Sequence, residues 1–205
     1  MPTGNTRLVR SGKLVIVAGI NGVGKTTVLN TMLKLLPPDL KVNVFNYGDV
    51  MLEIAKRNGW VAGRDDLRKL PLSKQLLLQE EAAEKLFDQA RQGNVVVDTH
   101  ALITTKNGFL PGLPKWVIET LQPDVIVLVE ALPEEILKRR LNDTMRVRDD
   151  QSTVEEIRLF LELNRSAAIS SAVFVGASVL IVRNVEGDAT QAASKIVKLF
   201  TPDNA

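Results

Sequence analysis

The sequence predicts an α/β fold in which a doubly wound, five-stranded parallel sheet carries helices on both faces. Short apolar runs rich in β-branched residues alternate with longer segments of helical spacing along the whole chain. Several of these runs are apolar at every position, as in strands that are buried on both faces. No repeat, low-complexity tract or Pro/Ser/Gly-rich linker interrupts the alternation, so we expect one domain over residues 1–205.

The apolar runs place the expected strands, and the helical spacing places the helices. The five expected strands are residues 14–18, 42–45, 95–97, 125–129 and 179–182. The expected helices are residues 26–36, about 49–57, 73–92, 114–121, 133–141, 154–171 and 189–200. Pro37 and Pro38 stop the first helix because proline cannot continue its hydrogen bonds, and Gly93 ends the longest one.

Composition restricts the classes of function. The 205 residues are 45% hydrophobic and 24% charged, which is ordinary for a globular protein. No apolar run is long enough to cross a membrane, and residues 1–13 lack the apolar stretch of a secretory signal, so we expect a cytoplasmic protein without a membrane partner. The net charge of +2 is too small to indicate nucleic acid. The absence of cysteine excludes disulfides, thiolate metal sites and cysteine nucleophiles.

The first expected strand leads directly into a phosphate-binding motif. Residues 19–26 read Gly-Ile-Asn-Gly-Val-Gly-Lys-Thr and match the P-loop pattern G-x-x-x-x-G-K-[ST]. The glycines let successive backbone N–H groups converge on phosphate oxygens, and the following helix directs its positive end to the same place. We expect Lys25 to reach the β- and γ-phosphates and the Thr26 hydroxyl to bind Mg²⁺. The alternative is a chance match in a glycine-containing turn, but the strand before it and the helix after it favour the P-loop.

An acidic residue follows the third buried run. Asp98 comes directly after residues 95–97, where an acid can support Mg²⁺ from the carboxyl edge of the sheet. A solvated acid at a strand end is the alternative. Direct ligation and the holding of a metal-bound water both remain open.

Arginines gather between residues 139 and 165. They are Arg139, Arg140, Arg146, Arg148, Arg158 and Arg165. Phosphoryl transfer between two nucleotides brings about six negative charges together, and bidentate guanidinium groups suit that task. The alternative is basic residues at a helix C-terminus with surface ion pairs to Asp149 and Asp150, and placement alone does not exclude it.

Several further motifs resemble the archaeal adenylate kinase family. They are Tyr-Gly-Asp at 47–49, Arg-Asp-Asp-Leu-Arg-Lys-Leu at 64–70, Asp-Thr-His-Ala at 98–101, Gly-Phe-Leu-Pro-Gly-Leu-Pro at 108–114, Arg-Val-Arg at 146–148 and Val-Glu-Gly-Asp at 185–188. The resemblance covers about residues 13–200. It implies a P-loop nucleoside monophosphate kinase that uses ATP and Mg²⁺, with an AMP-binding insert at about 47–70, a short lid at about 140–149 and homotrimeric assembly.

The resemblance also implies roles for individual residues. ATP phosphates would be bound by Gly19, Ile20, Asn21, Gly22, Val23, Gly24, Lys25, Thr26 and Thr27. AMP would be bound by Tyr47, Gly48, Asp49 and Arg68, with His100 as a hydrogen-bond donor to AMP or merely solvated. The catalytic residues would be Lys25, Asp98, Arg146, Arg148 and Arg165, with Arg158 as a competing candidate for the phosphate contact of Arg165.

Departures from the broader adenylate kinase pattern keep other functions open. Residues 98–101 replace the Asp-Gly-Phe/Tyr-Pro-Arg motif of bacterial and eukaryotic members, so the phosphate contact of that arginine must come from elsewhere. A short lid without cysteine cannot hold a structural zinc ion. Another small P-loop kinase, acting on CMP, UMP or an alcohol, is one rival, although an alcohol acceptor would need a general base. A nucleotide-binding switch protein is the other, but the Asn/Thr-Lys-x-Asp motif of guanine-specific switches is absent.

The lid residues give the first prediction. Residues 140–149 have few apolar anchors, so we expect bound nucleotides to draw Arg146 and Arg148 inward and exclude water. Replacing both arginines by alanine should cut turnover strongly and weaken AMP affinity only slightly. Hydrogen exchange of this segment, with and without a bisubstrate analogue that joins two adenosines, measures the closure. Equal exchange in both states would mean a fixed loop with ordinary surface arginines.

Overall fold

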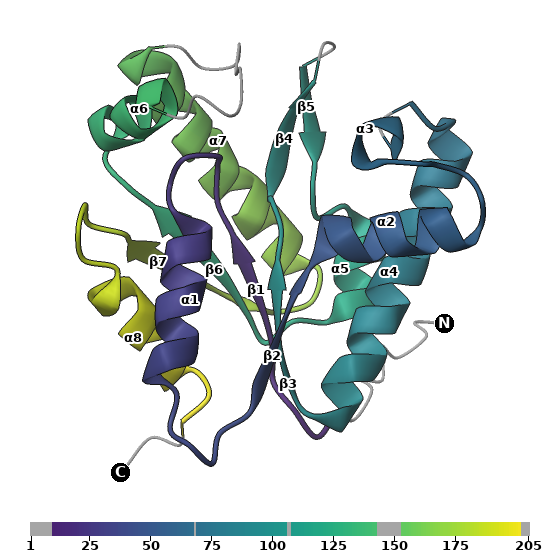
Figure 1. Cartoon of the computed structure of the whole chain (residues 1–205), viewed down its shortest axis with the longest axis horizontal. Helices are drawn as coiled ribbons and strands as arrows, with labels where there is room; N and C mark the ends of the chain where they lie inside the picture. Colours follow the sequence, from purple (N-terminus) through teal and green to yellow (C-terminus); the bar gives the residue numbers. More distant parts are fainter. Residues whose placement is uncertain (1–9, 68, 106–107, 143–152, 202–205) are drawn as a thin grey trace.

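A five-stranded parallel sheet lies at the centre of the chain, as predicted. The computed structural model describes residues 10–67, 69–105, 108–142 and 153–201 (Figure 1). The strands of the sheet are β1 (Leu14–Ala18), β2 (Val42–Asn46), β3 (Asn94–Asp98), β6 (Val125–Glu130) and β7 (Ser178–Arg183). Their spatial order is β2-β3-β1-β6-β7, and every neighbouring pair is parallel.

The helices fall where the spacing predicts them, with ends shifted by a residue or two. They are α1 (Lys25–Leu35), α2 (Tyr47–Arg57), α4 (Leu72–Gln92), α5 (Lys115–Leu121), α6 (Pro133–Asn142), α7 (Val154–Val173) and α8 (Thr190–Lys198). Asn46 caps α2 by accepting a hydrogen bond from the Asp49 amide. Thr153 and Glu156 form a capping box at the start of α7. Gly93 ends α4 in an extended conformation rather than a left-handed one.

The two faces of the sheet carry two separate apolar clusters. Leu14, Ile16 and Ala18 of β1 face a cluster with α2, α4 and α5. Val15 and Val17 face the opposite cluster, with α1 and α8. All five residues of β1 are fully buried, as expected for a strand covered on both faces. Helix α7 contributes to both clusters, its first half to one and its second half to the other.

Two short elements were not predicted from the sequence. Strands β4 (Leu102–Thr105) and β5 (Gly108–Pro111) form an antiparallel hairpin outside the main sheet, and α3 (Arg64–Leu67) is a single helical turn. The hairpin stands beside α7 in Figure 1, and the ring of Phe109 stacks on Phe160 of α7 with 5.6 Å between centroids. Both elements are too short to carry a periodic apolar pattern, which explains why the sequence did not predict them.

The sheet brings separate chain segments to one edge. Val17 of β1 is in register with Asp98 of β3, and Ala18 is in register with Leu128 of β6. Because the strands are parallel, the segments that follow β1, β3 and β6 all begin at the carboxyl edge, which is where open α/β sheets bind ligands. The fold therefore positions the P-loop, Asp98 and the end of β6 together.

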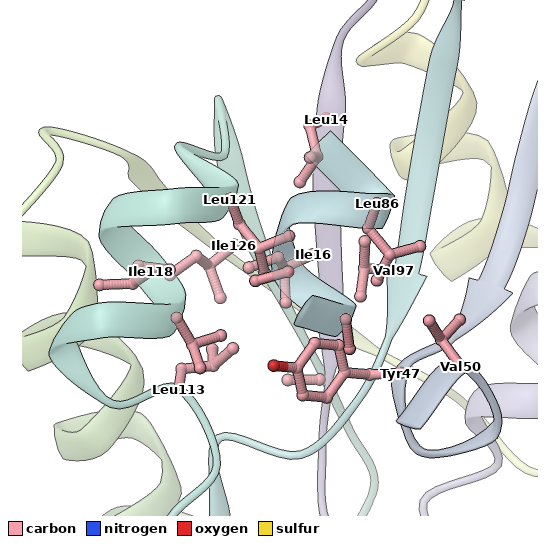
Figure 2. Close-up of a cluster of buried hydrophobic side chains, with 14 of the residues drawn as sticks. Leu14, Ile16, Tyr47, Val50, Leu86, Val97, Leu113, Ile118, Leu121 and Ile126 are labelled. Carbon is pink, nitrogen blue, oxygen red and sulfur yellow. The ribbon is translucent and has the colours of Figure 1, made fainter. Parts of the chain in front are cut away.

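The side chain of Tyr47 belongs to the core. It is 5% exposed and lies among aliphatic side chains from β1, α4 and α5 (Figure 2). Its hydroxyl donates a hydrogen bond of 2.6 Å to the Gln79 carbonyl of α4. Burial raises the pKa of Tyr47 above its usual value, so the hydroxyl stays protonated and remains a donor. The side chain thus fastens the start of α2 to α4.

This placement predicts the effect of Tyr47→Phe. Loss of the hydroxyl should lower the free energy of unfolding by about 1 kcal/mol, because one intramolecular hydrogen bond is lost while the ring still fills its site. Chemical denaturation of both proteins measures the difference, and calorimetric titration with AMP is the control. An unchanged stability together with a large loss of AMP affinity would instead make the hydroxyl a substrate contact.

Candidate active site

The P-loop connects the carboxyl end of β1 to the first turn of α1. Gly22 and Gly24 have φ values of 92° and 86°, in the left-handed region that glycine adopts without strain. Successive N–H groups in such a loop form a concave anion-binding site at the start of a helix. Ile20 and Val23 are buried beneath the loop, whereas Thr26 is exposed. The loop therefore has the geometry that the motif predicts.

Two side chains contact the first carbonyl of the P-loop. Lys25 Nζ donates to the Gly19 carbonyl at 3.0 Å, and His100 Nδ1 lies 2.9 Å from the same oxygen. A carbonyl can only accept, so Nδ1 must carry a proton. In a neutral imidazole the other ring nitrogen is then an acceptor, and donation to an AMP phosphate would require the charged ring. The contact with Gly19 associates His100 with the P-loop, while its predicted role toward AMP stays a prediction.

Asp98 and Thr26 are the residues available for Mg²⁺. Asp98 Oδ2 accepts a 3.0 Å hydrogen bond from Asn46 Nδ2. Its other oxygen, Oδ1, is buried and has no hydrogen-bond partner within the part of the chain that the structure describes. An unpaired buried carboxylate oxygen at this edge fits a role toward a hard cation or its bound water. Among the described residues, no group of three or more His, Asp or Glu side chains is arranged to hold a metal ion, so most other ligands would be phosphate and water oxygens.

A polar network joins Asp98 to the start of α2. Asn46 Oδ1 accepts from Arg64 Nη2 at 3.3 Å, and Arg64 Nη1 pairs with the Asp49 carboxylate. A Cβ at Gly48 would lie 2.6 Å from Arg64 Nη2, so glycine makes room for the guanidinium. Arg64 is half-exposed and was not among the predicted site residues, although it belongs to the motif at 64–70. The sequence signal for Arg64 was its place as the first residue of that motif.

The carboxyl end of β6 holds Arg165 of α7. Arg165 Nε and Nη2 donate to Glu130 Oε1 and Oε2 at 2.7 and 2.6 Å. The hydrogen bond that Arg165 donates to the nearly buried Glu130 raises the pKa of Arg165, so the guanidinium stays charged. Arg158 lies two helical turns earlier, with 61% of its side chain exposed, and it forms an ion pair of 3.8 Å with Glu134. Of the two candidates, Arg165 is the one that the structure holds at the carboxyl edge.

Three further side chains contact the P-loop from outside. Arg139 and Arg140 of α6 and Asn184, the residue after β7, all donate to P-loop carbonyls. The two arginines were noticed in the sequence without an assigned site role, and Asn184 was not singled out. Its position directly after a strand at the carboxyl edge is the same signal that pointed to Asp98.

Three of the predicted site residues lie outside the described residues. They are Arg68 of the AMP-binding insert and the lid residues Arg146 and Arg148. Their predicted roles are carried forward without a structural test.

Comparisons with known proteins identify the family. The adenylate kinase of Sulfurisphaera tokodaii is 49% identical over 190 residues, which cover 90% of this chain and 97% of that protein. The adenylate kinase of Methanocaldococcus jannaschii is 45% identical, with coverage of 92% and 98%. The chain belongs to the adenylate kinase family. An AAA domain family model also matches residues 18–158, which include the P-loop.

Solved structures place this adenylate kinase family member among kinases of the same fold. The shikimate kinase of Acinetobacter baumannii superposes with a TM-score of 0.57 at 17% identity, covering 93% of each chain. The shikimate kinase of Bacteroides thetaiotaomicron gives 0.50 at 16% identity, with coverage of 91% and 96%. At such low identity the likeness shows the fold alone. Within the described residues, no helix combines the length and apolarity needed to cross a membrane.

The unpaired oxygen of Asp98 predicts a metal-dependent phenotype. Asp98→Asn keeps the shape of the side chain and can still accept from Asn46, but it removes the negative charge. The reaction rate should fall, and the Mg²⁺ concentration for half-maximal rate should rise several-fold. Steady-state rates over a Mg²⁺ titration measure this. Asp88→Asn, a surface acid on α4 with 64% of its side chain exposed, is the matched control. If the Mg²⁺ titration of Asp98→Asn overlays that of the parent protein, Asp98 has no role toward the metal ion.

Proposed function

We propose that this protein is an adenylate kinase that transfers the γ-phosphoryl group of MgATP to AMP and forms two ADP. The identity of 45–49% to adenylate kinases over nearly their whole length carries the proposal. The P-loop supports it from the donor side, and the basic side chains at the carboxyl edge support it from the acceptor side.

On the donor side, the P-loop N–H groups and Lys25 would hold the triphosphate. Lys25 Nζ rests on the Gly19 carbonyl and would turn to the β- and γ-phosphates when ATP binds. Thr26 and Asp98 would hold Mg²⁺, directly or through its water, and the ion would neutralise charge on the β- and γ-phosphates. The remaining P-loop residues that we assign to ATP phosphates are Gly19, Ile20, Asn21, Gly22, Val23, Gly24 and Thr27.

On the acceptor side, AMP would bind along residues 47–70, next to Gly48 and Asp49. We assign its phosphate to Arg68, with Arg64 as a second cation that already lies over Gly48. Tyr47 would contribute by holding α2 in place, because its side chain is in the core. We also assign His100 to the AMP site, where it would form a hydrogen bond to AMP.

The transfer itself requires positioning and charge neutralisation. An oxygen of the AMP phosphate forms a bond to the γ-phosphorus while the bond to the β,γ-bridging oxygen breaks, and ADP leaves with that electron pair. No general base is needed, because the attacking oxygen is already ionised at neutral pH. Arg146, Arg148 and Arg165 would neutralise the charge of the transferred group. Since Arg165 uses Nε and Nη2 for Glu130, we assign Nη1 to the phosphate.

The family also suggests how the protein is organised and where it acts. We propose a single domain with a short lid at about 140–149, a homotrimeric assembly and a cytoplasmic location. The two relatives named above, from Sulfurisphaera tokodaii and Methanocaldococcus jannaschii, are archaeal, which supports an archaeal-type enzyme. Adenine nucleotides are its proposed partners, and nucleic acid is not among them.

An acceptor panel tests the function. Purified protein receives MgATP with AMP, CMP, UMP or shikimate in parallel, and a coupled assay measures ADP formation. Turnover with AMP at least ten times faster than with any other acceptor would support an adenylate kinase. A preference for CMP, UMP or shikimate would replace it with another small kinase, and binding without turnover would favour a switch protein.

Lys25→Ala in the same assay tests the role of the P-loop. One preorganised charged contact is worth about 3–4 kcal/mol in a transition state, so turnover should fall by two to three orders of magnitude. The fold should persist, because the Lys25 side chain contacts a loop carbonyl rather than the core. Circular dichroism checks the fold, and a folded variant that keeps more than a tenth of the parent activity contradicts the proposed role.

A further inference from the structure

The outer side of the P-loop is held through its carbonyl oxygens. Asn184 Nδ2 donates to the Val23 carbonyl at 2.7 Å, and Arg139 Nη1 reaches the same oxygen at 3.2 Å. Arg140 Nε and Nη2 donate to the Asn21 carbonyl at 3.0 and 2.8 Å. These donors come from α6 and from the end of β7, far from the P-loop in sequence.

Peptide geometry connects these carbonyls to the phosphate site. In a trans peptide, the carbonyl of one residue and the N–H of the next point in opposite directions. A Val23 carbonyl held outward therefore directs the Gly24 N–H inward, and the Asn21 carbonyl does the same for the Gly22 N–H. The N–H groups of the P-loop are the anion-binding groups, so donors on the outer side determine the geometry of the inner side.

Asn184 is the most rigid of these donors. It is 4% exposed. Its backbone N–H donates to the Glu130 carbonyl at 2.7 Å, which extends the pairing of β7 with β6 by one residue. Its short side chain has few rotamers to lose, whereas an arginine side chain costs more conformational entropy to hold. Asn184 thus connects the sheet to the P-loop, because its backbone is hydrogen-bonded to β6 and its side chain to Val23.

The glycine at position 24 of the P-loop leaves room for the Asn184 side chain. A Cβ at Gly24 would lie 2.3 Å from Asn184 Nδ2, so the side chain occupies the space that this glycine leaves. The φ of 86° at Gly24 explains the glycine by conformation, and the close approach of Asn184 adds a second reason. The two residues are 160 positions apart and fit only in the folded chain.

We propose that Asn184 is a positioning residue that holds the Val23–Gly24 peptide in its phosphate-binding orientation before ATP arrives. The triphosphate then binds a loop that does not need to rearrange, and less binding free energy is lost to ordering. The proposal deepens the proposed function by naming a determinant of the donor site, and it rests on that function only for turnover measurements.

The competing explanation is a purely structural hydrogen bond. A buried carbonyl without a partner is costly anywhere in a protein, so loss of Asn184 could lower stability without a specific effect on ATP. The two explanations differ in what happens to the two substrates. A general loss of stability affects the sites for ATP and AMP alike, whereas a displaced P-loop affects ATP alone.

Asn184→Leu tests the proposal, because leucine keeps the shape and removes the donor. Calorimetric titration with MgATP and, separately, with AMP gives both dissociation constants. We expect the MgATP constant to rise about tenfold and the AMP constant to stay within about twofold, since one hydrogen bond of this kind corresponds to about a tenfold change. In turnover assays the KM for ATP should rise while the KM for AMP stays the same.

Ser171→Ala is the matched control. Ser171 is also buried, and its hydroxyl donates to the Leu113 carbonyl at 2.8 Å, away from the P-loop. Its loss should lower the unfolding temperature and leave both nucleotide affinities unchanged. Unfolding temperatures of all variants without nucleotide separate stability from binding.

Two results would overturn the proposal. One is an Asn184→Leu protein that binds MgATP within twofold of the parent, and the other is an equal loss of affinity for MgATP and AMP. If leucine does not fold, Asn184→Ala is titrated in the same way, and the fitted binding stoichiometry corrects for inactive protein. Because these titrations need no turnover, a parent protein that fails the acceptor panel would reject the proposed function without deciding the role of Asn184.

Discussion

The parallel pairing of β1 with β3 and β6 is the constraint on which the site depends. It aligns Val17 with Asp98 and Ala18 with Leu128, so the P-loop, Asp98 and the end of β6 lie at the same level along the sheet. β1 can occupy this central position because all of its residues are apolar and buried on both faces. A change of register here would shift Asp98 and Glu130 relative to the P-loop, whatever their own side chains contact.

Three cationic groups that the structure describes in the candidate site already have anionic or carbonyl partners. Arg165 pairs with Glu130, Arg64 with Asp49, and Lys25 with the Gly19 carbonyl. These contacts hold the three cationic side chains in place, and the hydrogen bond to Glu130 also raises the pKa of Arg165. Nucleotide phosphates must compete with partners of this kind, so part of the affinity depends on how easily each one is exchanged. Water screens the exposed pair of Arg64 and Asp49 strongly, and it screens the pair of Arg165 and Glu130 less, because Glu130 is nearly buried.

The P-loop is supported from two sides for different reasons. At the start of the loop, Lys25 and His100 both contact the Gly19 carbonyl oxygen and hold it in place. On the outer side, Asn184 and the α6 arginines fix the later carbonyls. Arg139 and Arg140 stand in the last turn of α6, at the point in the sequence where the proposed lid begins. The P-loop is therefore joined by hydrogen bonds to the segments that follow β3 and β7 and to helix α6.

The sequence by itself determined the main secondary-structure elements and the position of the P-loop motif. Apolar periodicity placed the five parallel strands and the long helices. An element that is buried on one or two faces has a matching spacing of apolar residues in its own sequence, so the pattern can be recognised without the fold. The P-loop was equally local, since its glycines, lysine and threonine are contiguous. Asp98 could be proposed because a strand end is visible in the sequence. The short hairpin of β4 and β5 and the single turn of α3 carry too few residues for such a signal.

Only the tertiary structure decided which side chains meet. The sequence assigned Tyr47 to AMP, and the fold buries its side chain against Gln79 of α4. The sequence left Arg158 and Arg165 as competitors, and the fold holds Arg165 against Glu130. Asn184 lies 161 residues from Val23 and gives no local sign of its contact with it. Contacts of this kind depend on how helices and strand ends pack around the sheet, and periodicity records only which face of an element is buried.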